Sequence, residues 1–215
     1  MQTNRFQLPA EKMQNLVTLA NSGKRKAALK EAKQFEKSYP RDPALKNFIG
    51  VIYASIGNED FAVKNFKSII KNSPSYIPAY TNLANCFSQK CKYSDAIKTL
   101  KQALKAKKEA PDVFVALGAN YQMNGELANA IASYRSALAL NPKHVEGWIN
   151  LGNALWENGR PKLAADAYLE ALIIMPENFH QLLNKFQYHL MVVIKILRFP
   201  KRMVIFSMIL DLWLD

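Results

Sequence analysis

With 215 residues, of which 49% are hydrophobic and 21% charged, the chain can bury a continuous core, which excludes disorder along its whole length. Its eight glycines, ten prolines and two cysteines exclude collagen-like, low-complexity and disulfide-stapled classes. The formal net charge of +12 is uneven, because residues 1–110 hold 20 Lys and Arg against 8 Asp and Glu, so any electrostatic function is expected in this first half.

Alanines, prolines and glycines recur with a period of 34 residues, which indicates a repeat protein. Alanine keeps the period throughout, whereas Lys108 takes the place of one proline and Cys91 that of one glycine. The period predicts a lead at 1–8, five units at 9–42, 43–76, 77–110, 111–144 and 145–178, and an apolar segment at 179–215. The columns are Ala28, Ala62, Ala96, Ala130 and Ala164; Pro40, Pro74, Pro142 and Pro176; and Gly23, Gly57, Gly125 and Gly159.

Each unit is predicted to form two helices, because apolar residues keep the i, i+3, i+4, i+7 spacing on both sides of the turn glycine. This apolar pattern is weakest in the first unit. Asp42, the last residue of the first unit, and Pro43 open the next helix, as a favourable cap followed by a first-turn proline. In the fourth and fifth units, the small pairs Gly118 with Ala130 and Gly152 with Ala164 are expected to let two helices cross closely.

The fourth and fifth units resemble the tetratricopeptide repeat, whose pattern is an aromatic, Leu-Gly, an aromatic, a later Ala, an aromatic and a Pro. The second and third units match in part, and the first is degenerate. The resemblance implies an all-α fold, a right-handed superhelical solenoid of antiparallel helix pairs whose inner groove binds another protein. The matching residues are Phe114, Leu117, Gly118, Tyr121, Ala130, Tyr134 and Pro142, then Trp148, Leu151, Gly152, Ala164, Tyr168 and Pro176.

The wall of such a groove follows from helix geometry, since the face opposite the packed stripe of each first helix has a 4, 3, 4 spacing. This series contains no Lys or Arg and mixes amides with apolar side chains. Amides donate and accept hydrogen bonds, so they favour the backbone of an extended polypeptide. The predicted groove residues are Gln14, Asn21, Phe48, Asn82, Asn85, Gln89, Met123, Asn150, Asn153 and Glu157. The alternative is that the asparagines are only solvated surface residues.

The asparagine-bearing wall is also similar to the repeat arm of O-linked N-acetylglucosamine transferases, and of bacterial proteins that join such repeats to a glycosyltransferase or sulfotransferase domain. Phe48 and Ala116 interrupt the asparagine ladder. The absence of Lys and Arg from the wall argues against the members of the family that grip the terminal carboxylates of chaperones.

Nine lysines on the second helices of the first three units form three columns of the same period. We expect them to form a basic outer ridge, which either keeps the surface solvated or binds an acidic partner, anionic lipid or nucleic acid phosphate. No specific nucleic acid is predicted. The columns are Lys30, Lys64 and Lys98; Lys33, Lys67 and Lys101; and Lys37, Lys71 and Lys105.

The sequence offers no pattern for catalysis, a cofactor or a metal. The three histidines have no neighbours that would make a triad or a metal site, and there is no phosphate-binding glycine loop. Cys86 and Cys91 lie five residues apart and are expected to be structural. We therefore expect a non-enzymatic protein.

The last segment differs in composition, since 20 of the 29 residues from Phe186 to Leu214 are apolar. It is interpreted as an atypical capping helix, as a membrane anchor, or as the end of a chain that lost a following domain. The amino terminus lacks the apolar run of a secretory signal, so a cytoplasmic location is expected. The favoured function is a protein-interaction module with a peptide in the groove; the alternatives are the substrate-recruiting arm of a truncated glycosyltransferase or sulfotransferase, and an adaptor tethered to a membrane by its tail.

Overall fold

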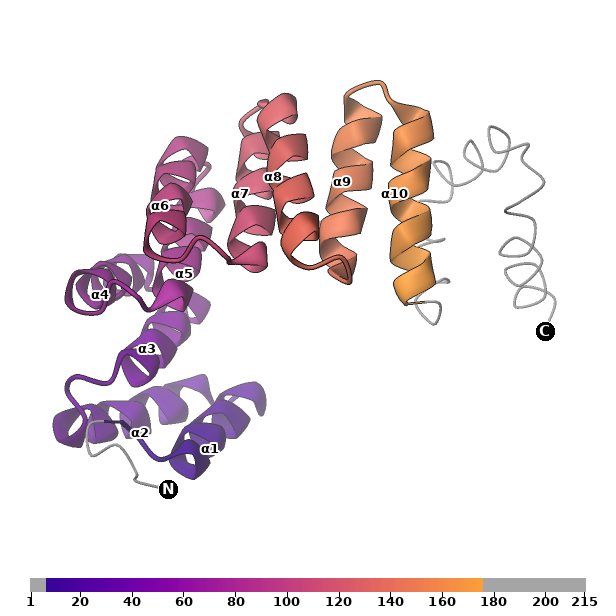
Figure 1. Cartoon of the computed structure of the whole chain (residues 1–215). Coiled ribbons are helices and arrows are strands. Elements are labelled where there is room, and N and C mark those ends of the chain that lie inside the picture. The colour runs from indigo at the N-terminus through magenta and orange to yellow at the C-terminus, as the bar shows by residue number, and fades with distance from the viewer. Residues whose placement is uncertain (1–6, 176–215) are drawn as a thin grey trace, which may run out of the picture. The chain divides into compact units, whose positions relative to one another are not determined.

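The computed structural model describes residues 7–175, which form ten α-helices and no strand (Figure 1). The predicted all-α fold is therefore confirmed, and the helices alternate with short turns. Their bounds are α1 Ala10–Asn21, α2 Arg25–Ser38, α3 Pro43–Ser55, α4 Glu59–Asn72, α5 Ile77–Gln89, α6 Tyr93–Ala106, α7 Pro111–Met123, α8 Leu127–Leu140, α9 Val145–Glu157 and α10 Pro161–Ile174.

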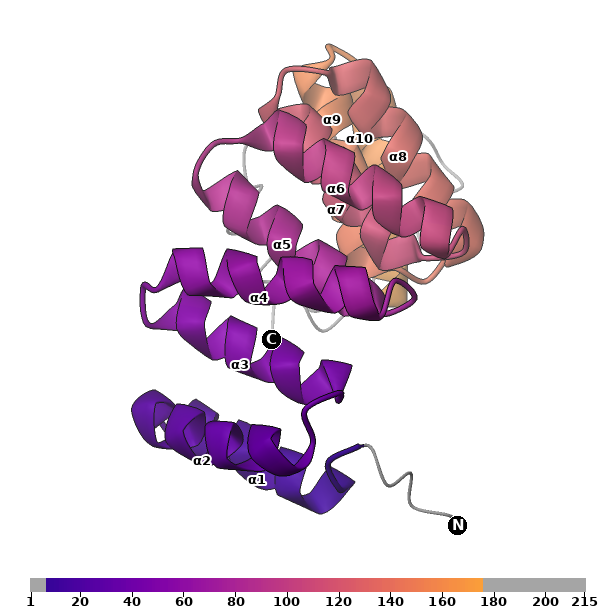
Figure 2. The same cartoon turned by 90° about the vertical axis from the view of Figure 1, so that its left-hand side faces the viewer.

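The chain divides into two compact units, Met1–Leu140 and Asn141–Asp215. In the first, each helix from α1 to α7 packs against the next one in the chain, and α3 also contacts α5, which contacts α7. Figure 2 shows α3, α4 and α5 stacked in chain order. In the second, α9 packs against α10. The boundaries of the five predicted repeats stay a prediction, and most of the lead at 1–8 and all of the segment at 179–215 lie outside the described residues.

The periodic prolines follow the second helices, as the pattern indicates. α2, α4 and α8 each end two residues before a proline, at Ser38, Asn72 and Leu140. α6 ends at the equivalent Ala106 although Lys108 replaces the proline, so the proline is not required to end the helix there. Two of these turns are also tied to the following helix, because Tyr80 Oη donates to the carbonyl of Pro74 at 3.0 Å and Trp148 Nε1 to that of Pro142 at 2.8 Å.

The core of each of three hairpins contains a ring of the second helix packed on a glycine of the first. Phe66, Tyr134 and Tyr168 are buried, and they lie against Gly50, Gly118 and Gly152 respectively. A Cβ added to Gly118 would lie 2.5 Å from Cε1 of Tyr134. At Gly118 and Gly152, where a close helix crossing was expected, a larger side chain would meet the aromatic ring of the second helix.

Asp42 fixes the start of α3 and holds the segment that precedes α1. Its carboxylate is 2% exposed and accepts hydrogen bonds from the backbone N–H of Ala44, Leu45 and Leu8, at 2.8, 3.2 and 2.7 Å. The predicted cap is confirmed, and the contact with Leu8 adds a link across 34 residues. Leu8 and Leu45 belong to one buried cluster with Leu16, Ala32 and Ile49, so the Asp42 carboxylate holds two parts of this cluster together.

Cys91 takes a backbone conformation that suits glycine. Its φ is 55°, whereas the four turn glycines have φ between 70° and 83°. Cys91 is the only non-glycine residue with positive φ in the described part of the chain, which confirms the prediction that it replaces a turn glycine. For a residue with a Cβ, this left-handed region is strained by about 1–2 kcal/mol.

Cys91→Gly is expected to raise the free energy of unfolding by about 0.5–1 kcal/mol. The change removes the strain but gives the unfolded chain more conformational freedom, which reduces the gain. Urea unfolding followed by circular dichroism measures the effect. Cys91→Ala is the matched control, since it removes the thiol but keeps the Cβ; an equal gain in both variants would contradict the backbone explanation.

Candidate functional site

Half of the ten predicted groove residues lie on α3, α5 and α7, first helices of which α3 contacts α5 and α5 contacts α7. The exposed residues at the groove positions of these helices are Val51, Ser55, Pro78, Asn85, Gln89, Asp112 and Met123, and Met123 is 64% exposed. Neither Lys nor Arg occurs at the groove positions of these three helices. This surface therefore presents amides beside exposed apolar groups and carries no cation.

Two of the predicted groove residues on these three helices are less open than expected. Phe48 is half-buried and packs on the core formed with Leu45 and Ile49. Asn82 is half-buried as well, and its Nδ2 donates to Oδ1 of Asn47 at 2.8 Å. The amide of Asn82 thus joins α3 to α5 and has one hydrogen bond already made within the protein.

A second polar link joins α5 to α7. Oγ of Ser88 donates to Oδ1 of Asn120 at 2.5 Å, and Asn120 is only 6% exposed. Neither Asn47 nor Asn120 was identified from the sequence, because the two linked pairs are 35 and 32 residues apart and so fall outside columns spaced by 34. A search for polar pairs one residue away from the repeat period would have found the first of them.

The remaining predicted groove residues lie on α1 and α9. Gln14 and Asn21 are exposed on α1. On α9, Asn150 is half-buried, Glu157 is exposed, and Asn153 accepts a hydrogen bond from Tyr168 Oη at 2.8 Å. Burial and then the nearby Glu157 raise the pKa of Tyr168, so its hydroxyl stays protonated as the donor of this bond. Asn153 therefore helps to join α9 to α10.

All nine lysines of the predicted ridge are exposed, but the middle column differs from the expectation. Nζ of Lys33 lies 5.1 Å from the ring centre of Tyr53, that of Lys67 5.9 Å from Phe87, and that of Lys101 5.4 Å from Tyr121. Each lysine thus reaches from a second helix to the first helix of the next pair. A hydrogen bond to Tyr121 also raises the pKa of Lys101.

The middle column is therefore part of the contact between hairpins rather than a free outer surface. Each such cation–π contact contributes about 0.5–1 kcal/mol at an exposed site. The other two columns, at Lys30, Lys64 and Lys98 and at Lys37, Lys71 and Lys105, are exposed and form no ion pair with a described residue.

The side chains of Cys86 and His144 have structural contacts. Burial raises the pKa of the Cys86 thiol, which keeps it protonated and packed in the core. His144 caps α9, since its Nδ1 accepts a hydrogen bond from the N–H of Gly147 at 3.0 Å. Between residues 7 and 175, no group of three His, Cys, Asp or Glu side chains is arranged to hold a metal ion. His180 and His189 lie outside the described residues.

Within the same range, none of the helices combines the length and the apolar character needed to cross a membrane. The segment proposed as a membrane anchor, 186–214, lies outside the described residues.

Solved structures of helical-repeat proteins share this fold. A thermophilic TPR protein of Thermus thermophilus matches with a TM-score of 0.70 and 23% identity over 84% of this chain and 98% of its own. MamA matches with a TM-score of 0.63 and 21% identity over 74% of this chain and 94% of its own. MamA 41-end from Desulfovibrio magneticus RS-1 matches with a TM-score of 0.63 and 19% identity over 77% of this chain and 94% of its own. No curated protein sequence matches the chain significantly.

The fold thus defines a helical-repeat protein built from antiparallel hairpins. Two family models of the tetratricopeptide repeat match residues 79–114 and 115–178, so this part of the chain, which is less than half of it, is similar to tetratricopeptide repeats. The sequence resemblance is confirmed at this level. The similarity to transferase arms stays a prediction.

Proposed function

We propose that this chain is a non-catalytic protein-interaction module that binds an extended polypeptide along the wall of α3, α5 and α7. Tetratricopeptide repeats in general mediate contacts between proteins. The observation that carries the proposal is the surface formed by Val51, Asn85, Gln89 and Met123, all exposed and without a cation among them. The amides would pair with peptide N–H and C=O groups, and the apolar side chains would contact side chains of the peptide.

A displayed library of unstructured peptides provides the test of this proposal. Peptides selected on the full chain are expected to bind the Asn85→Ala/Gln89→Ala double variant about 10-fold more weakly, which corresponds to one or two lost hydrogen bonds. Fluorescence anisotropy measures the affinity.

Gln102→Ala is the matched control, because Gln102 is an exposed amide on the second helix α6. Its affinity should equal that of the unchanged chain. Equal weakening by Gln102→Ala, or no weakening by the double variant, would contradict binding at the wall.

A second candidate concerns the exposed lysine columns, which form a proposed site for an acidic partner. Six lysines without a described carboxylate partner favour it. Short poly-glutamate is expected to bind, and Lys64→Gln/Lys98→Gln should weaken it several-fold. Because the attraction is electrostatic, affinity should fall steeply between low and high salt. An affinity that does not change with salt would exclude this site. The two exposed lysine columns would then be explained by solubility alone.

The other functions stay predictions. A recruiting arm of a transferase would bind its substrate at the same wall. The peptide test therefore does not distinguish it from a simple interaction module, because the arm also requires a catalytic domain. A membrane-tethered adaptor requires residues 186–214, and vesicle co-sedimentation of the full chain against a chain ending at residue 184 tests it.

A further inference from the structure

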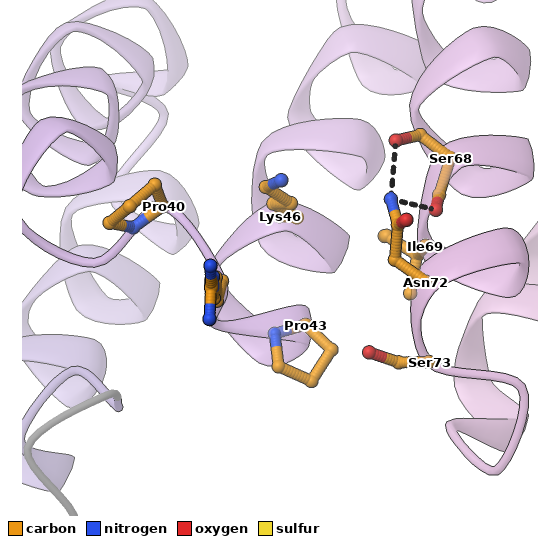
Figure 3. Close-up of a pocket in the computed structure, with 8 residues that line it drawn as sticks. Pro40, Pro43, Lys46, Ser68, Ile69, Asn72 and Ser73 are labelled. Atoms are coloured by element: carbon orange, nitrogen blue, oxygen red, sulfur yellow. Dashed lines mark hydrogen bonds between the residues drawn. The ribbon is translucent and has the colours of Figure 1, made fainter.

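A cavity of about 510 Å³ lies at one end of the α3–α4 hairpin, away from the residues of the proposed peptide wall. Its lining comes from the turn before α3, the first turn of α3 and the last turn of α4. Figure 3 shows Pro40, Pro43 and Lys46 on one side and Ser68, Asn72 and Ser73 on the other. Arg41 and Ile69 complete the lining.

The cavity has two cations and no acidic side chain in its lining, namely Arg41 and Lys46. Neither forms an ion pair with a described residue. The nearest acid in the sequence, Asp42, does not line the cavity, and its carboxylate already accepts three backbone hydrogen bonds. The positive charge of Arg41 and Lys46 is therefore available to an anion that enters the cavity.

The opposite side supplies small polar groups. Asn72 Nδ2 donates to the backbone carbonyl of Ser68 at 2.9 Å and lies 3.4 Å from the Ser68 hydroxyl oxygen (Figure 3). This fixes the orientation of the Asn72 amide and leaves the hydroxyl protons of Ser68 and Ser73 able to donate. Ile69 and the rings of Pro40 and Pro43 form apolar walls beside these groups.

We propose that this cavity binds the phosphate group of an organic phosphate monoester. Two separate cations with nearby hydroxyl donors suit a phosphate dianion, which has three outer oxygens. A carboxylate carries a single negative charge and could neutralise only one of the two cations. The volume falls within the range of about 300–1,000 Å³ typical of sites for organic ligands and exceeds what a lone ion needs. The apolar walls take the organic part, which is either a phosphorylated side chain of a protein or a free phosphorylated metabolite.

The test is a titration of the full chain followed by ³¹P NMR, with blocked phosphoserine, ribose 5-phosphate and inorganic phosphate as probes. Arg41→Gln and Lys46→Gln are each expected to weaken the better ester about 10-fold, as for the loss of one charge-assisted contact. Arg41→Lys, which keeps the charge but loses the planar fork, should fall in between. Arg25→Gln and Lys26→Gln are matched controls on exposed residues outside the cavity and should change the affinity less than twofold.

Tighter binding of blocked phosphoserine supports a phosphorylated protein as the source, and tighter binding of ribose 5-phosphate supports a metabolite. Binding of inorganic phosphate as tightly as either ester would overturn the monoester proposal. So would no binding of any probe, or equal weakening by the control variants. Circular dichroism of every variant separates loss of binding from loss of fold. The result is independent of the peptide wall, because none of Val51, Asn85, Gln89 and Met123 lines the cavity.

Discussion

Tyr134→Ala is expected to lower the free energy of unfolding by about 3–5 kcal/mol, the usual cost of removing a large buried aromatic side chain. Tyr134 is 1% exposed, its ring fills the space over Gly118, and its hydroxyl is hydrogen-bonded to Gln122 at 3.2 Å. Urea unfolding measures the loss. Tyr134→Phe is the matched control and should cost only about 1 kcal/mol, since it removes the hydrogen bond and keeps the ring.

A double-mutant cycle then tests whether Gly118 is present because of the ring. In the unchanged chain, Gly118→Ala places a methyl group against Tyr134 and is expected to cost about 1–3 kcal/mol. In the Tyr134→Ala background the same methyl meets a cavity, so Gly118→Ala should be neutral or stabilising. If the two substitutions change the free energy of unfolding additively, this would contradict the explanation that Gly118 makes room for the Tyr134 ring.

Asp42→Ala is expected to lower the free energy of unfolding by about 2–4 kcal/mol. The change leaves three backbone donors without their acceptor, and those of Leu8 and Leu45 are buried. Because the lost bonds include the one to Leu8, the Leu8 amide should also exchange its hydrogen faster, which NMR measures directly.

Two controls define the origin of this loss. Asp42→Asn keeps an oxygen for the start of α3 but turns an N–H₂ toward Leu8, so about half of the loss is expected. Asn58→Ala changes the residue that precedes α4, where no side-chain cap bond exists, and should have little effect. A loss in Asn58→Ala as large as in Asp42→Ala would contradict the capping explanation.

The helix pairs could be predicted from the sequence because each marker of the repeat acts locally. A cap such as Asp42, a turn residue such as Cys91 and a proline such as Pro74 act within a few residues of themselves. Their spacing is therefore enough to place the turns. The same reasoning explains why Cys91 was correctly identified as a glycine substitute.

The contacts between helices could not be predicted in the same way. Lys33 reaches an aromatic ring 20 residues further on, and Asn47 pairs with Asn82 at a distance that differs from the period by one residue. Such pairs depend on how far a side chain extends and on the angle at which two helices cross, and one sequence specifies neither. For the same reason, the contacts that the predicted groove residues Phe48, Asn82 and Asn153 make within the protein could not be predicted.

The cavity at Arg41 and Lys46 was also beyond the sequence. Its two sides come from segments less than one 34-residue unit apart, and of its lining residues only Pro40 belongs to one of the periodic columns identified from the sequence. The lysine columns lie on the second helices. The cations of the cavity lie elsewhere, with Arg41 in the turn before α3 and Lys46 in the first turn of α3.

Site-directed photo-crosslinking of a selected peptide tests the proposed peptide wall most directly. A photoreactive amino acid is placed in turn at Asn85, Gln89 and Met123 on the wall, and at Lys64, Lys98 and Gln102 on the second helices. Crosslinks at the first three positions and none at the last three are predicted. Crosslinks confined to the second helices would contradict the proposal that the wall of α3, α5 and α7 binds the peptide.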